Sequence, residues 1–174
     1  SPDLLVTLVC VVLGTAVGMV VKLDDRLNGV GDKLQSRLGR VGEGKFTEGL
    51  MAASLLFCIG PMTVMGSISD GLTGDYSVLA MKAVMDGITS MAMASTLGIG
   101  VGFSALVVFV VQGTLTLGAG LLQGIMTDAM LAHMTGAGGL ILVGLSFNLS
   151  MKAGIKAGNM LPALIVAAVA AAII

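Results

Sequence analysis

The stretch VLAMKAVMDGITSMAMASTL, residues 78–97, decides how this chain can fold, because it is long enough and apolar enough to cross a bilayer. Two charged residues, Lys82 and Asp86, interrupt it one helical turn apart, so they share a helix face and can neutralise each other. A charge inside hydrocarbon costs roughly 2.5–3.5 kcal/mol on insertion scales and is a functional candidate by default. This pair is the first candidate site.

The composition of the whole chain predicts an integral membrane protein. Apolar residues make up 56% of the 174 positions and charged residues 11%, whereas a soluble domain has about 25% charged residues. Mean hydropathy is +1.03. There is too little polar material to cover a soluble core, so we expect an all-α, polytopic transmembrane bundle in which residues 1–174 form a single domain.

Apolar stretches separated by polar or glycine-rich segments predict six membrane spans. They are residues 4–21, 47–68, 78–97, 103–123, 136–151 and 159–174. Within the first span, Gly14 and Gly18 form a G-x-x-x-G face of the kind that packs helices closely. The connections are expected to be a polar loop at 69–77, a tight glycine turn at 98–102 and a short segment at 124–135.

The segment 22–41 differs from the spans that flank it, because it is charged and its apolar residues recur every three or four positions. That spacing predicts an amphipathic helix on the membrane surface, ending at Gly39, Gly42 and Gly44. A partner-binding helix is the alternative. Loop 22–45 carries six Lys and Arg residues and is expected to be cytoplasmic, which makes loop 69–77 external. Every Lys and Arg except Lys82 then lies on the cytoplasmic side.

A break in the second predicted span is the second candidate site. Pro61 follows Gly60 and has no N–H to donate to the carbonyl of Phe57, so the helix should kink or break at mid-membrane. Transporters use such breaks to coordinate substrates and ions, whereas a packing kink is the structural alternative.

The remaining candidates are polar residues inside predicted spans. Thr89 continues the face of Lys82 and Asp86, and Gln112 and Asn148 are amides in two other spans. The functional interpretation is that these residues line a solute path or proton relay, with Asp86 as the titratable group. The alternatives are that Lys82 reaches towards water at the outer surface and that the amides only bind helices together.

Catalysis is not expected from this sequence. The turn at Gly102 and Ser104 loosely resembles that of a membrane serine hydrolase, but its only candidate base, His133, is predicted on the opposite side of the membrane. One histidine and two separated cysteines provide no metal cluster. We therefore expect no catalytic residues, no metal and no cofactor.

Several motifs resemble a bacterial family of uncharacterised inner-membrane proteins, the YqgA/YdfK type. They are FTEGLMAASLLFCIGPM at 46–62, GLTGDYS at 71–77, KAVMDG at 82–87, ASTLG at 94–98, GVGFSA at 100–105, QGTLT at 112–116, GLI at 139–141, NL at 148–149 and NMLPAL at 159–164. The resemblance covers nearly the whole chain and implies a multi-pass protein of the bacterial inner membrane, a candidate transporter with no established substrate. Members of the family are longer at the amino end by about two hydrophobic helices, which this chain is expected to lack.

These observations favour a transporter or exporter of an unidentified small solute, with ion coupling as an option, whose path runs between Gly60-Pro61 and Asp86. The alternative is a membrane scaffold or accessory subunit in which the same residues only join helices. The expected partners are the lipid bilayer and a small solute, a homo-oligomer is left open, and nucleic acid is not expected because no basic patch is present. If the polar residues converge on one cavity, transport is favoured.

Overall fold

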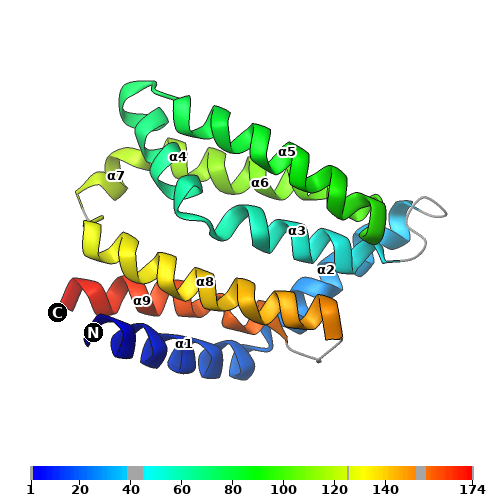
Figure 1. Ribbon diagram of the computed structural model, residues 1–174, viewed down its shortest axis with the longest axis horizontal. Helices are drawn as coiled ribbons and strands as arrows, with labels where there is room; N and C mark the ends of the chain where they lie inside the picture. The colour runs from blue at the N-terminus through cyan, green and yellow to red at the C-terminus, as the bar shows by residue number, and fades with distance from the viewer. Residues whose placement is uncertain (1, 39–44, 125, 152–155, 174) are drawn as a thin grey trace. The chain divides into compact units, whose positions relative to one another are not determined.

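The computed structural model describes residues 2–38, 45–124, 126–151 and 156–173, and every regular element in these ranges is a helix (Figure 1). The predicted all-α class is therefore confirmed. The elements are α1 (Pro2–Val21), α2 (Leu23–Leu38), α3 (Phe46–Ile59), α4 (Pro61–Thr73), α5 (Ser77–Leu97), α6 (Gly100–Leu117), α7 (Ala119–Gln123), α8 (Asp128–Met151), the 3-10 helix η2 (Ala157–Met160) and α9 (Pro162–Ile173).

By its internal contacts the chain divides into two compact units. Unit 1 comprises Ser1–Leu27 and Met126–Ile174, and unit 2 comprises Asn28–Ile125. That residues 1–174 act as a single membrane domain stays a prediction.

Unit 1 is built from α1, α8 and α9, which pack against one another (Figure 1). One cluster of its buried residues has mostly small side chains, which lets the helix backbones approach closely: Cys10, Val11, Ala137, Ala163 and Ala167. A Cβ added at Gly14 would lie 2.2 Å from Cα of Ala163, and one at Gly18 would lie 1.9 Å from the carbonyl oxygen of Asn159. The predicted G-x-x-x-G face of α1 is therefore a packing surface against η2 and α9.

The junction between α1 and α2 is held by hydrogen bonds to η2. Lys22 separates the two helices with a left-handed φ of 53°. The backbone N–H of Asp24 donates to Oδ1 of Asn159 at 2.8 Å, and the N–H of Gly158 donates to Oδ1 of Asp24 at 3.0 Å. The predicted helix is confirmed over 23–38, and its position on the membrane surface stays a prediction. Its expected end at Gly39, Gly42 and Gly44 lies outside the described residues.

Unit 2 is organised around α6, which packs along both halves of the broken helix formed by α3 and α4. A Cβ at Gly100 would meet the carbonyl oxygen of Phe46, at the start of α3, and one at Gly71 would meet that of Thr116, near the end of α6. The α6 helix returns antiparallel to α5 after a turn in which Gly98 has φ +77° (Figure 1). The predicted glycine turn is confirmed, and α6 begins within it at Gly100.

The predicted break at Gly60-Pro61 is confirmed. The α3 and α4 helices meet there at 60°, with Gly60 extended (φ −63°, ψ 145°) and Pro61 as the first residue of α4. Pro61 leaves the carbonyl of Phe57 without its helical donor, and Oγ1 of Thr63, which is fully buried, donates to that carbonyl at 2.9 Å. The carbonyl that the break frees therefore has a hydrogen-bond partner within unit 2, as is required where no water is available.

Several predicted boundaries are corrected by the structure. The α4 helix continues to Thr73 and is capped by Gly74 with φ 72°, so the predicted loop 69–77 shrinks to residues 74–76. The predicted fourth span, 103–123, is divided between α6 and α7 by Gly118. The α8 helix begins at Asp128 and not at 136, because Oγ1 of Thr127 accepts the N–H of Met130 and caps it. These boundaries were wrong because they were placed at polar residues, and the ends of a helix can include polar residues.

By length and composition, the described residues hold two to four candidate membrane spans. Gly100–Leu117 and Asp128–Asn148 each qualify alone, and Leu5–Val21 with Leu23–Arg37 and Phe46–Ile59 with Pro61–Thr73 qualify as bent pairs. Of the six expected spans, 78–97 forms a helix of sufficient length, α5, which contains Lys82 and Asp86. It is not among these candidate spans. The α9 helix has 12 residues, about 18 Å at 1.5 Å per residue, which is short of a bilayer core of about 30 Å.

The close approach of α1 to α9 can be tested by adding one methyl group. We expect Gly14→Ala to lower the free energy of unfolding by about 1–3 kcal/mol, because the new Cβ must displace the backbone of Ala163. Gly139→Ala is the control, since nothing lies within 4 Å of a Cβ at Gly139, also in unit 1. Unfolding in detergent would measure both, and a Gly14→Ala protein as stable as the control would contradict the packing.

Candidate functional site

A pocket of about 350 Å³ lies between α5 and α6, and Phe57 of α3 is also part of its lining. It contains both charged residues of α5. Its lining residues are Phe57, Leu79, Lys82, Ala83, Asp86, Gly87, Ser90, Val101, Gly102, Ser104, Ala105, Val108, Phe109 and Gln112. Three of the seven residues predicted for the site, Lys82, Asp86 and Gln112, therefore meet in one pocket.

Lys82 is buried although its side chain carries a full positive charge. It is 5% exposed, its Nζ hydrogen-bonds to Oδ2 of Asp86, and the same Nζ lies 5.9 Å from the ring centroid of Phe57. The predicted pairing of Lys82 with Asp86 is confirmed. The alternative that Lys82 reaches towards outer water is wrong, because ion pairing and the aromatic face stabilise the ammonium inside unit 2.

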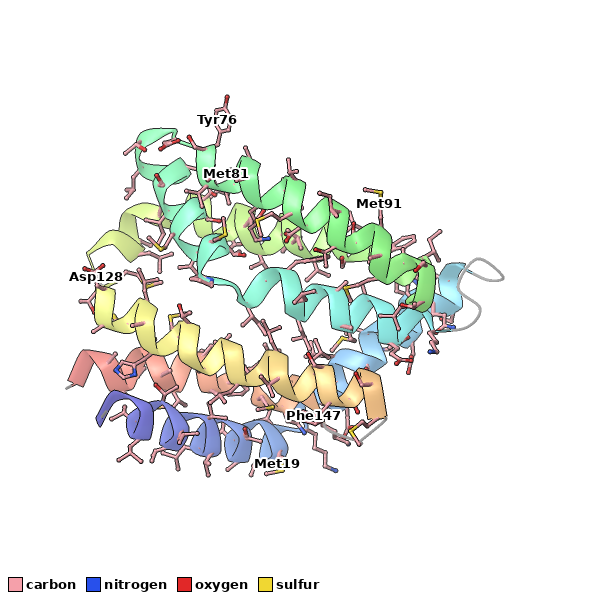
Figure 2. All side chains as sticks on the ribbon, in the orientation of Figure 1. Met19, Tyr76, Met81, Met91, Asp128 and Phe147 are labelled. Atoms are coloured by element: carbon pink, nitrogen blue, oxygen red, sulfur yellow. The ribbon has the colours of Figure 1, made fainter. Side chains whose placement is uncertain are left out.

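The pocket and the outer surface occupy opposite faces of α5. The residues facing the pocket include Lys82, Asp86 and Ser90, spaced four apart. The outward side carries large apolar residues that are 58–70% exposed: Met81, Val84, Met85, Ile88 and Met91. The side chains of Tyr76, the residue before α5, and of Met91 point away from the other helices of unit 2 (Figure 2). A helix with its charges inside and its apolar side chains outside is typical of a lipid-facing position.

The remaining polar lining groups are two hydroxyls and an amide. Oγ of Ser90 donates to the carbonyl of Gly87 at 2.8 Å, and Oγ of Ser104 donates to that of Val101 at 2.7 Å. Each hydroxyl oxygen retains its capacity to accept a hydrogen bond. Gln112 adds an amide from α6. Together with the ion pair, these groups provide donors and acceptors for a small polar molecule.

Four residues predicted for the site do not line this pocket. Thr89 is exposed and donates to the carbonyl of Met85. It does not line the pocket because the pocket-facing side of α5 continues from Asp86 to the fourth residue, Ser90, and not to the third. Gly60 and Pro61 shape the break beneath Phe57 without reaching the pocket. Asn148 is half-buried on α8, in unit 1.

Eleven of the fourteen lining residues were not predicted for the site, and Ser90, Phe57 and Ser104 are the ones with polar or aromatic groups beside the ion pair. Ser90 was detectable, since it lies eight residues after Lys82 on the same helix face. Phe57 and Ser104 were not, because they reach the pocket only when α3 and α6 pack against α5. No local pattern marks them.

The helical fold, the apolar outer surface and the charged inner pocket define a multi-pass helical membrane protein. The chain belongs to the family described as a protein of unknown function, DUF554, whose model matches residues 1–172. The resemblance noted from the motifs is thus confirmed.

Two relatives are similar over most of the chain. YdfK of Bacillus subtilis (strain 168), described as an uncharacterized membrane protein, is 31% identical over 159 residues, covering 91% of this chain and 66% of YdfK. YqgA of Escherichia coli (strain K12), described as uncharacterized, is 30% identical over 159 residues, covering 89% of this chain and 68% of YqgA. The chain thus spans about two thirds of the length of these relatives. No solved structure matches it.

The coupling between Lys82 and Asp86 can be measured with a double-mutant cycle. We expect Lys82→Met and Asp86→Asn each to destabilise the protein, and the double variant to recover about 1–3 kcal/mol of the summed loss, because neither single change leaves the remaining charge a partner. Unfolding in detergent would give the four free energies.

The matched control is the exposed pair of Lys156 and Asp25, 2.6 Å apart in unit 1. Lys156→Met and Asp25→Asn should show no measurable coupling, since water already solvates both groups. Additive effects at Lys82 and Asp86, as at the control pair, would contradict the assignment.

Proposed function

We propose that the protein is a transporter or exporter of a small solute in the bacterial inner membrane, coupled to an ion. The observation that carries the proposal is the pocket between α5 and α6, where Lys82 and Asp86 face inward from a helix whose other side is apolar. Charges are costly at membrane depth, and where they face a cavity they commonly mark a solute or ion path.

Two features of unit 2 support a moving solute over a fixed structural pair. The lining is uneven, with Lys82 buried and the side chain of Asp86 26% exposed, so one end of the ion pair is open to the pocket. The helix beneath is broken at Gly60, and broken helices border the substrate sites of many transporters. Asp86 is the residue proposed to take part in ion coupling.

The proposed orientation follows from the distribution of basic residues. Segment 22–45 carries Lys22, Arg26, Lys33, Arg37, Arg40 and Lys45, which supports a cytoplasmic position for it. The connection within 69–77 carries only acidic charge, Asp70 and Asp75, which supports an external position.

Flux from proteoliposomes tests the proposal. Vesicles are loaded with a metabolite extract of bacterial cells, and the solutes that leave are measured by mass spectrometry against protein-free vesicles. We expect at least one small solute to leave faster with the wild type, and Asp86→Asn to slow it by about tenfold or more, because a charged hydrogen-bonding group of the pocket is lost.

Thr89→Val is the control variant, since Thr89 lies on the same helix outside the pocket and should leave the flux unchanged. A scaffold or accessory subunit would produce no solute-specific flux. That outcome, or equal flux from wild type and Asp86→Asn, would overturn the proposal.

A further inference from the structure

The charges of the pocket restrict the chemistry of the solute. Among the described residues that line it, Lys82 contributes one positive charge, Asp86 contributes one negative charge, and the others are neutral. The two charged groups already touch. A solute that binds between them must therefore separate an ion pair in surroundings of low dielectric constant.

The cost of that separation differs among solute classes. A simple anion would take Lys82 and leave the carboxylate of Asp86 without a counter-charge, and a simple cation would do the reverse. Breaking a buried pair by removing one partner costs several kcal/mol. A molecule that carries both charges gives each residue a new partner, so no charge is left unpaired.

The size and the walls of the pocket set a second condition. About 350 Å³ is near the lower end of ligand-binding pockets. The walls beside the ion pair are apolar and include Phe57, Leu79 and Val108, while Gln112 and the hydroxyl of Ser104 lie among them. This lining suits a compact molecule with a charged end and a short, largely apolar body.

We propose that the solute is a small zwitterion of the α-amino acid class, whose carboxylate binds Nζ of Lys82 and whose ammonium group binds the carboxylate of Asp86. The proposal rests on the transport function proposed above and specifies its substrate class. The exchange creates two charge-assisted contacts where one existed.

Binding to the purified protein tests the charge requirement. The probes are the proteinogenic amino acids with uncharged side chains, each with its N-acetyl derivative, which is an anion, and its methyl ester, which is a cation. We expect at least one free amino acid to raise the unfolding temperature of the wild type. Its two singly charged derivatives should bind about ten- to hundredfold more weakly, since each loses one charged contact.

Variants of the pair should exchange this preference in a defined way. With Asp86→Asn, the N-acetyl derivative should become the best ligand, because Lys82 is left without a counter-charge. With Lys82→Gln, the methyl ester should become the best ligand, because Asp86 is left without one. The swapped pair, Lys82→Asp with Asp86→Lys, keeps both charges and should retain the preference for the zwitterion even if the single variants do not fold. Thr89→Val should behave as the wild type.

The outcomes separate this inference from the transport function. If no amino acid binds, or if a singly charged derivative or an uncharged sugar binds the wild type as tightly, the zwitterion assignment is wrong. If another solute of the extract still leaves vesicles in an Asp86-dependent manner, transport stands without it. If no solute does, both fall.

Discussion

The ion pair of Lys82 and Asp86 is the interaction on which the interpretation of unit 2 depends. It lies on the inner face of a helix whose outer face is apolar and exposed, the reverse of the arrangement in a soluble protein. Such a pair is stable only where other groups surround it, and α6 together with the ring of Phe57 provides them. The pocket is the space beside the charges that α5, α6 and Phe57 leave unfilled.

The broken helix supports this arrangement from below. Gly60-Pro61 redirects the chain by 60°, and the lost backbone hydrogen bond is replaced by the hydroxyl of Thr63. Phe57 takes part in both features, because its carbonyl accepts the hydrogen bond from Thr63 and its ring lies under Nζ of Lys82. The break and the ion pair, two separate features of the sequence, thus meet at one residue of the fold.

Local chemistry explains which features could be predicted from the sequence. The break follows from the missing N–H of Pro61, and the pairing follows from the four-residue spacing of Lys82 and Asp86. The depth of Lys82 could not be predicted, because a lysine near the end of a span reaches water unless another helix covers it. The predicted helix ends were wrong because capping residues, and not polar content, determine them: Gly74 caps the end of α4 and Thr127 caps the start of α8.

On this interpretation, the pocket face of α5 is accessible to water and the opposite face contacts lipid. Thiol labelling in liposomes tests it, in a background where Cys10 and Cys58 are replaced by alanine. A charged, membrane-impermeant methanethiosulfonate should modify Ser90→Cys, on the pocket face, and leave Val84→Cys, on the exposed apolar face, unmodified. Labelling of Val84→Cys with an inert Ser90→Cys would contradict the account.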